Sequence, residues 1–407
     1  MRSARVALHG HIIDSLLLPK VLDEITTRGG SWELEQLEVG RRREDLSHAA
    51  LRLEAPDAAT LEEILAAIQA HGATPIAAGE AQLEPAPADG VFPPGFFVTS
   101  NQPTEIRHRG RWLPVEPVRM DCGVAIDPAA GSARAVRFPQ VRKGDRVVVG
   151  HEGVRVEPLQ RNVRRADAFE FMGSEVSTEK PKSLAIRAVA DAMREARAAA
   201  QKLLLVAGPA VVHTGAAPHV VRLIEAGYVD LLFSGNALAV HDVEQAIYGT
   251  ALGIHLDYGM PVSHGHQHHL HAINRIRAAG GLRTAVEQGI IGSGIMHACI
   301  RHGIDFVLAG SVRDDGPLPE VITDVVRAQQ VMGEKVQGVG FALMVATMLH
   351  SIATGNLLPA TCRIACVDIN PSAVTKLVDR GSFHSVGLVT DVEPFFLELL
   401  GALDLRR

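Results

Sequence analysis

The densest group of chemically versatile side chains in this sequence is the stretch SHGHQHHLHAIN. It contains His264, His266, His268, His269 and His271. Imidazole is a common ligand of zinc, copper and nickel, and near neutral pH it can also move protons or hold a carboxylate. We expect no metal here, because no carboxylate or thiolate set lies nearby in the sequence and the HExxH spacing of helical zinc sites is absent.

A second candidate is DFVLAGSVRDDGPLPE at Asp305–Glu320, an apolar run that ends in Arg313, Asp314 and Asp315 before two prolines. It is typical of a buried strand that delivers polar groups to its carboxyl edge, where Asp314 and Asp315 would face a site. The alternative is a polar loop in which Asp or Pro simply starts the next helix.

The same pattern recurs along the second half of the chain. Apolar runs end in Gly, Asn, Thr, His or Asp in LLLVAGPAVVHTG, VDLLFSGNALAVHD, GFALMVATMLHS, RIACVDINP and VGLVTDVEP. In an open parallel sheet, ligands bind outside the carboxyl ends of the strands, where helix amino-termini also point. The recurrence therefore favours one shared ligand edge over a set of unrelated loops.

From Lys202 onward, strands alternate with helices, which predicts a doubly wound parallel sheet of about six strands. The dinucleotide motif GxGxxG appears only as GSGIMH and GVGFAL, and both lack the third Gly or Ala. Asp368 is better placed, because it ends the strand IACVD, where a carboxylate can bind a nucleotide ribose. The turn TMLHS at Thr347–Ser351 could offer free backbone N–H groups to a pyrophosphate.

Residues 1–88 follow the order strand, helix, strand, strand, helix, strand, in RVALHGHII, SLLLPKVLDEITTRGG, WELEQLEVG, HAALRLEAP, TLEEILAAIQAHGA and IAAGEAQLEP. This is the βαββαβ order of ferredoxin-like modules. His9 and His11 are the only candidates for chemistry in this module. Strand histidines that point to solvent explain them equally well.

A linker rich in Pro, Ala and Gly, PAPADGVFPP, follows this module, and short β-like runs then predict a small β-rich subdomain. Asp121 and Cys122 could line a pocket there, although a turn Asp beside a small buried thiol is the simpler interpretation. FEFMGSEVSTEKP at Phe169–Pro181 is an unusual polar loop or a capping segment for the next helix. We expect three domains, at 1–88, 89–180 and 181–407.

Composition excludes several classes of function. The chain has 407 residues, 47% apolar and 21% charged, which is typical of a soluble globular protein. A net charge of −6 without basic blocks between aromatics argues against nucleic-acid binding, and no apolar run reaches about 18 residues, so we expect no membrane contact. Four cysteines without a signal peptide indicate the reducing cytoplasm, with Cys362 and Cys366 as core thiols.

Taken together, the motifs resemble one family. They are FEFMGSEVSTEKP, AGPAVVHTGA, SGNALAVHDVE, GHQHHLHAINRIR, SGIMHACI, VLAGSVRDDGPLP, ATMLHSIATGN, VDINPSAVTKLVDRG and VTDV. The chain is similar over nearly its whole length to the archaeal and bacterial ornithine cyclodeaminases related to the carboxyl-terminal part of the cyanobacterial arginine dihydrolase ArgZ/AgrE. The same family is known as the LOR/SDH bifunctional-enzyme conserved region.

The resemblance implies an NAD-dependent conversion of L-ornithine to L-proline and ammonia, with hydride removed from the α-carbon, ring closure by the δ-amine, and return of the hydride. The cofactor contacts that it implies are Asn236, Ala237, Asp315, Thr347, Met348, Leu349, His350, Asp368, Asp391 and Val392. We add His264, His268 and Asp314 as candidates for proton handling. Arg313 could pair with the substrate carboxylate or form a structural ion pair.

Several alternatives stay open. The LOR/SDH relationship would also suit another NAD-dependent amino-acid dehydrogenase, acting on saccharopine- or lysine-type substrates. A non-enzymatic alternative is a module that senses an amino acid and NAD. We expect a homo-oligomer, and we do not expect arginine dihydrolase activity, because residues 1–88 are too short for an amidine-hydrolysing domain and lack a cysteine nucleophile.

Overall fold

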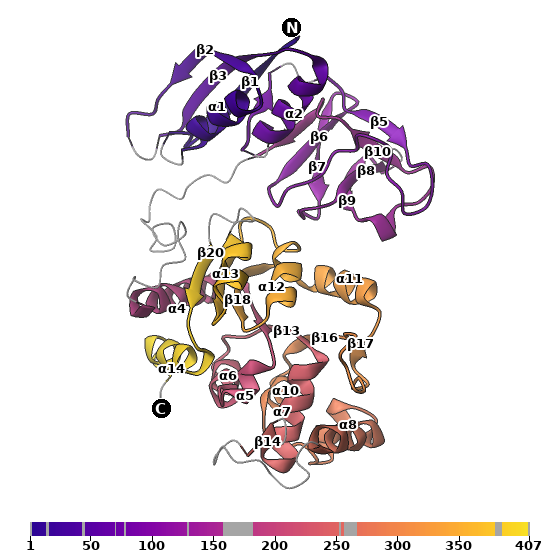
Figure 1. Cartoon of the computed structure of the whole chain (residues 1–407), viewed down its shortest axis with the longest axis vertical. Coiled ribbons are helices and arrows are strands. Elements are labelled where there is room, and N and C mark those ends of the chain that lie inside the picture. The colour runs from indigo at the N-terminus through magenta and orange to yellow at the C-terminus, as the bar shows by residue number, and fades with distance from the viewer. Residues whose placement is uncertain are drawn as a thin grey trace. The chain divides into compact units, whose positions relative to one another are not determined.

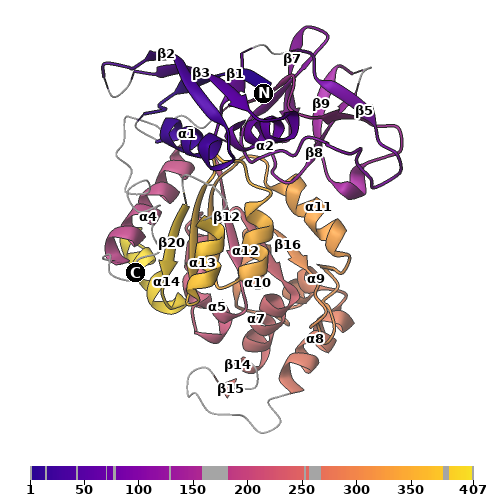
Figure 2. The same ribbon diagram turned by 45° about the horizontal axis from the view of Figure 1, so that its top comes forward.

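The structure of the chain is a computed structural model that describes residues 2–13, 16–42, 45–69, 71–76, 79–127, 130–157, 182–251, 254–255, 267–378 and 385–405. It divides into two compact units, Met1–Ala166 and Asp167–Arg407. Figure 1 gives the element labels, and Figure 2 shows the same chain turned by 45°.

The first unit begins with a four-stranded sheet in the order β2-β3-β1-β4, with antiparallel neighbours throughout. Its elements are β1 (Arg2–Gly10), α1 (Leu17–Thr27), β2 (Ser31–Glu38), β3 (Ser47–Ala55), α2 (Ala58–Gln69) and β4 (Thr74–Pro75). Apolar residues four apart on the helices, such as Ile64 and Ile68, are fully buried against Leu51 and Leu53 of β3. The predicted ferredoxin-like topology is confirmed.

A seven-stranded sheet follows in the same unit, in the order β11-β6-β7-β9-β8-β10-β5. Its elements are β5 (Gln82–Pro85), β6 (Thr104–His108), β7 (Arg111–Glu116), β8 (Gly123–Asp127), β9 (Ser132–Val136), the 3₁₀ turn η1 (Phe138–Gln140), β10 (Arg146–Val149) and β11 (Val154–Val156). This sheet confirms the predicted β-rich region.

One strand prediction at this junction was wrong. The stretch IAAGEAQLEP was expected to form a single strand of the ferredoxin-like sheet. Instead, β4 ends at Pro75, and β5 pairs antiparallel with β10 in the second sheet. The physical reason is that Leu83 packs against the core of the second sheet, so this part of the stretch gains more burial there.

The second unit is built on a fully parallel sheet in the order β17-β16-β13-β12-β18-β19-β20. Its strands are β12 (Lys202–Ala207), β13 (Leu231–Gly235), β16 (Asp305–Ala309), β17 (Val321–Ile322), β18 (Val339–Val345), β19 (Arg363–Asp368) and β20 (Ser385–Val389). The strand order reverses between β12 and β18, so the sheet is doubly wound with its switch point at that pair. A short hairpin, β14 (Thr250–Ala251) and β15 (Ile254–His255), lies outside this sheet.

Helices cover both faces because every inner strand is apolar on both sides. One face carries α4 (Lys182–Ala198), α5 (Ala210–His213), α6 (Ala217–Glu225), α7 (Asn236–Tyr248), α8 (His268–Ala279), α9 (Leu282–Glu287), α10 (Ile295–Arg301) and α14 (Val392–Ala402). The other face carries α11 (Val325–Lys335), α12 (Met348–Gly355) and α13 (Pro371–Val378), which lie together in Figures 1 and 2.

Cys362 and Cys366 belong to the second core, and burial raises the pKa of both thiols to about 12. They are the core thiols that the sequence predicted. Among the helices that the structure describes, none combines the length and apolar composition needed to span a membrane.

Candidate functional site

The switch point is closed by a backbone contact that only glycine permits. Gly208 follows β12, and its N–H donates to Val345 O at 2.9 Å. A Cβ on Gly208 would overlap the carbonyl of Ala346, which follows β18 and has a positive φ of 52°. The chain segments after β12 and β18 therefore start from a fixed point, and in open α/β sheets ligands bind outside the strand ends at such a switch point.

The amino-terminus of α12 lies at this point. Thr347 is the N-cap, and its side chain makes no capping hydrogen bond among the described residues. The first N–H groups of a helix lack intrahelical partners and carry partial positive charge, so this terminus suits an anion. Leu349, the second residue of α12, is 78% exposed, so this terminus carries an apolar residue open to solvent.

His350 lies over the neighbouring strand. Its ring carbon Cε1 is 3.4 Å from the position that a Cβ on Gly235 would take. Its Nδ1 is buried and has no hydrogen-bond partner among the described residues, and burial lowers the pKa of this imidazole. A neutral ring with an unpaired buried nitrogen can form a hydrogen bond with a bound ligand.

Two acidic side chains lie at the carboxyl ends of the next two strands. Asp368 ends β19 and is half-buried, and its Oδ1 accepts a hydrogen bond from Asn370 N at 2.8 Å. It lies about twenty residues after Thr347, the separation between the phosphate turn and the ribose-binding acid in dinucleotide-binding βαβ units. Asp391 follows β20 and caps α14 by accepting from Val392 N at 2.6 Å.

On the other side of the switch point, Asn236 and Ala237 begin α7 directly after β13. Asn236 is only 4% exposed, and its amide holds the loop after β16: Oδ1 accepts from Leu318 N at 3.1 Å, and Nδ2 donates to Gly316 O at 3.5 Å. The side chain of Asn236 therefore fixes the loop that carries the two aspartates.

Within that loop, Asp314 closes a turn. Its Oδ2 accepts from Ser311 N at 2.8 Å, whereas Asp315 extends to solvent with 68% of its side chain exposed. Asp315 Oδ2 lies 3.4 Å from His269 Nε2 on α8. Arg313 is exposed. The loop thus presents Asp315 to α8, while the carboxylate of Asp314 is engaged with its own turn.

A chain of polar side chains runs along α7. Glu244 is completely buried, its Oε2 lies 3.1 Å from His241 Nδ1, and its Oε1 accepts from Thr250 Oγ1 at 2.9 Å. Thr250 Oγ1 is in turn 2.9 Å from Nδ1 of His268, whose ring stacks on Tyr248. The predicted His268 is therefore linked by hydrogen bonds to a buried carboxylate.

The ring of His213, at the end of α5, meets the ring of His241 edge-on at 4.6 Å, and the ring of His269 lies 6.5 Å from His241. Burial, reinforced by His241, lowers the pKa of His213 to about 4, so this imidazole is neutral at pH 7. The sequence analysis did not single out His213, His241 or Glu244. The available signals were the motifs AGPAVVHTGA and SGNALAVHDVE, which contain these residues, and the spacing of three residues between His241 and Glu244, which puts them on one helix face.

Asp242, the residue after His241 on α7, contacts the start of α10. It is fully buried and accepts from Ile295 N at 2.7 Å and Met296 N at 2.8 Å, the first two residues of α10. Burial raises the pKa of this carboxyl to about 6 despite those two hydrogen bonds. The role of Asp242 is to cap α10.

The remaining sequence candidates lie elsewhere. His264, His266 and the polar loop Phe169–Pro181 are outside the described residues. Within the described ranges, no three His, Cys, Asp or Glu side chains converge into a set that could hold a metal ion. Cys122 is 2% exposed, and burial raises the pKa of its thiol; Asp121 occupies a left-handed turn with φ 58°.

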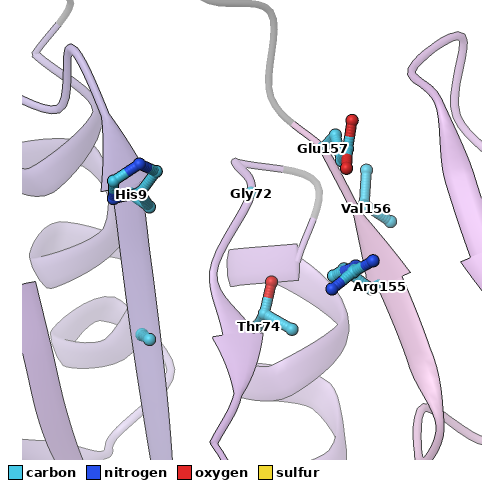
Figure 3. Close-up of a pocket in the computed structure, with 7 residues that line it drawn as sticks. His9, Gly72, Thr74, Arg155, Val156 and Glu157 are labelled. Atoms are coloured by element: carbon cyan, nitrogen blue, oxygen red, sulfur yellow. The ribbon is translucent and has the colours of Figure 1, made fainter. Parts of the chain in front are cut away.

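His9 lines a cavity of about 520 Å³ in the first unit, together with Ala7, Gly72, Thr74, Arg155, Val156 and Glu157 (Figure 3). Arg155 is the only strong cation of this lining. It donates to Glu105 Oε2 at 2.7 Å through Nε, and its guanidinium lies 4.4 Å over the Trp112 ring. The charge of Arg155 is thus already paired, so the described residues of this lining offer a ligand no strong cation without a partner.

Comparison with known proteins places this geometry in a family. The family model described as "Arginine dihydrolase ArgZ-like, C-terminal, Rossmann fold" matches residues 187–400, and the ArgZ-like first region matches 103–186. The "LOR/SDH bifunctional enzyme conserved region" matches 3–102. An ornithine cyclodeaminase from Methanothermobacter thermautotrophicus is 49% identical over 98% of this chain and 97% of the relative. The chain belongs to this ornithine cyclodeaminase family.

Solved members of the family share the fold. The apo structure of cyanobacterial ArgZ matches with a TM-score of 0.85 at 38% identity, over 99% of this chain and 58% of ArgZ. A complex of AgrE with ornithine and NAD⁺ matches with a TM-score of 0.54 at 41% identity, over 99% of this chain and 58% of AgrE. The chain therefore spans little more than half of the bifunctional cyanobacterial enzymes, but almost all of the archaeal family member.

Proposed function

We propose that this protein is an NAD-dependent ornithine cyclodeaminase that converts L-ornithine to L-proline and ammonia. The observation that carries the proposal is the division of the sheet edge into two halves at Gly208. Features that suit a nucleotide follow β18, β19 and β20, and side chains that could move protons follow β12, β13 and β16. The relatives named ornithine cyclodeaminase and the complex of AgrE with ornithine and NAD⁺ support the same function.

The residues of the first half fit a dinucleotide. Within the part of the chain that the structure describes, the amino-terminus of α12 has no side-chain cap and suits the pyrophosphate, and the buried Nδ1 of His350 has no hydrogen-bond partner; Asp368 suits the adenosine ribose. Since the ribose acid lies on the β19 side, the nicotinamide would lie on the β12, β13 and β16 side. When bound, NAD⁺ accepts a hydride from the ornithine α-carbon and returns it to the ring imine.

The second half supplies what the substrate requires. Ring closure needs the δ-amine in its uncharged form, so a base must be available to take a proton, and a neutral imidazole can do so. His213 is neutral at pH 7 by burial, and His241 and His268 are each linked to Glu244. Asp314 and His264 stay proposals for proton handling, and Asp315, Asp391 and Val392 stay proposals for cofactor contact.

The proposal is tested by incubating the purified protein with L-ornithine and a catalytic amount of NAD⁺. We expect proline and ammonia in equal amounts, without accumulation of NADH. NADH formed in proportion to the substrate consumed would contradict the proposal and favour an amino-acid dehydrogenase. The absence of turnover with any diamino acid would favour a sensor.

We also propose that the protein works in the cytoplasm as a homo-oligomer, with domain boundaries near residues 88 and 180. Four buried free thiols support a reducing compartment. The edge strand β2 supports an oligomer, because Trp32, Leu34 and Leu37 are about 40% exposed on one strand. The molar mass measured by light scattering tests the oligomer, and a monomer at all concentrations would exclude it.

A further inference from the structure

The buried carboxylate of Glu244 serves two histidines at once. Its two oxygens contact different partners, His241 directly and His268 through Thr250. Burying a carboxylate away from water costs free energy unless each oxygen receives hydrogen bonds. Glu244 is fully buried, so its contacts are a buried hydrogen-bond network and not an exposed ion pair.

The positions of the protons follow from a count of donors. With Glu244 ionised, its carboxylate only accepts, so the hydrogen between Glu244 Oε2 and the imidazole then belongs to Nδ1 of His241. The hydroxyl of Thr250 has one hydrogen, which it donates to Glu244 Oε1. It can therefore only accept from His268, whose Nδ1 must also carry hydrogen. Both imidazoles, when neutral, keep a lone pair on Nε2.

This pair of histidines lies on the half of the sheet edge where the nicotinamide is proposed to bind. His241 is in the second turn of α7, whose first residue follows β13, and His213 follows β12 on the neighbouring α5. On the remaining side, the titratable groups described nearby are His269 of α8 and its partner Asp315 in the loop after β16.

We propose that His241 is the base of ring closure and that Glu244 is the positioning residue that fixes its tautomer. The inference rests on the proposed cyclodeaminase function. Neutral His241 takes one proton from the δ-ammonium, and the freed δ-nitrogen bonds to the α-carbon of the protonated imine, whose C=N π pair moves onto the α-nitrogen. The imidazolium, stabilised by Glu244, gives this proton to the α-nitrogen, and His241 then takes the second proton from the ring nitrogen. The lone pair left on the ring nitrogen forms the ring C=N bond as the bond between the α-carbon and the α-nitrogen breaks, and the ammonia that leaves carries off the last proton from His241 as ammonium.

The decisive variant is Glu244→Gln. A glutamine has the same shape but one acceptor and one donor, so it can keep only one of the two histidines in its present tautomer, and it cannot stabilise an imidazolium. We expect kcat to fall on the order of 100- to 10,000-fold, with the Kd for NAD⁺ unchanged. The control is Glu225→Gln on α6, where an exposed glutamate pairs with Arg222 and the same chemical change should have no effect.

A second readout does not depend on activity. Nitrogen NMR of the imidazoles should show hydrogen on Nδ1 of both His241 and His268 in the unaltered protein, and a changed tautomer for at least one of them in Glu244→Gln. Thr250→Val removes both hydrogen bonds of the hydroxyl, the one to Glu244 Oε1 and the one to His268, and leaves the contact between Glu244 Oε2 and His241. It should change the His268 signal, leave that of His241 in place, and lower kcat by less than about tenfold.

The outcomes separate this inference from the proposed function. Proline formation by Glu244→Gln at a rate within threefold of the unaltered enzyme would overturn the role of His241 and leave the cyclodeaminase intact. Hydrogen on Nε2 of His241 in the unaltered protein would overturn the tautomer assignment, whether or not ornithine is a substrate. If Glu244→Gln does not fold, His241→Gln takes its place, and full activity of that variant would contradict the proposal.

Discussion

Burial shifts the pKa values of two residues next to His241, namely His213 and Asp242, in opposite directions. His213 loses its proton more readily than a free imidazole, because a buried cation is poorly solvated and His241 lies beside it. Asp242 holds its proton more tightly than a free carboxyl for the same reason, even with two backbone N–H groups on it. Their contributions to stability therefore have opposite dependence on pH.

The contribution of His213 can be isolated by substitution. Its folded pKa of about 4 lies below the ordinary value of 6.5, so the unfolded chain binds more protons between these limits. Stability from this group is complete above about pH 6.5 and is lost as the pH falls towards 4. We expect the free energy of unfolding, measured by urea unfolding, to fall less between pH 7 and pH 5 in His213→Gln than in the unaltered protein. Equal losses in the two proteins would show that His213 titrates normally.

The assignment of Asp368 to the nucleotide ribose leads to a binding prediction. Asp368→Ala should weaken NAD⁺ binding roughly ten- to hundredfold, because a charge-assisted pair of hydrogen bonds is lost. Titration calorimetry measures the change. Asp191→Ala is the control, since Asp191 is an exposed aspartate on α4 with 67% of its side chain accessible. Unchanged affinity in a folded Asp368→Ala protein would remove Asp368 from the cofactor site.

At the scale of elements, the local sequence pattern predicted where helices and strands form better than it predicted which strands pair. The ferredoxin-like order and the alternation of strands and helices could be read because apolar periodicity and turn residues are local properties. The division of IAAGEAQLEP between two sheets could not be read, because it depends on which distant strand buries Leu83. The switch point between β12 and β18 is likewise a contact between segments far apart in the sequence.

The capping of α10 by Asp242 gives a prediction about an element. Asp242→Asn keeps one acceptor but turns the other oxygen into a donor facing a backbone N–H, so we expect a loss of about 1–3 kcal/mol in the free energy of unfolding. Asp324 also accepts two backbone hydrogen bonds, from Val326 N and Arg327 N at the exposed start of α11, but both reach the same oxygen, Oδ1, which an asparagine keeps. Asp324→Asn should cost only a few tenths of a kcal/mol, since Asn and Asp are comparable exposed caps. Equal effects of the two substitutions would contradict the account.

The switch point gives a second prediction about elements. Gly208→Ala places a methyl group against the carbonyl of Ala346, so β12 and β18 must separate where the cofactor is proposed to bind. We expect a loss of about 1–3 kcal/mol in stability together with weaker NAD⁺ binding. Gly292→Ala is the matched control, because nothing lies within 4 Å of its added methyl and its φ is ordinary. Gly208→Ala with the thermal stability and NAD⁺ affinity of the control would show that the contact is not required.

At the scale of the whole molecule, the candidate site is assembled from segments that the sequence keeps far apart. The residues at strand ends could be predicted because the fold class dictates that they share one edge. His213, His241 and Glu244 could not, because a pair three residues apart on a helix usually forms an ordinary surface contact, and only the packing of α5 and α8 against α7 joins it to the edge. The boundaries near residues 88 and 180 stay predictions; the compact units divide at Ala166.

The measurement that tests the central claim most directly follows the hydrogen on the α-carbon. Ornithine carrying deuterium at that carbon is incubated with the enzyme and a catalytic amount of NAD⁺, and the proline is analysed by mass spectrometry. If one bound cofactor both removes and returns the hydride within a turnover, the proline keeps its deuterium and NAD⁺ is not consumed. Proline that has lost the label, or NADH that accumulates in step with substrate loss, would contradict the assignment as a cyclodeaminase.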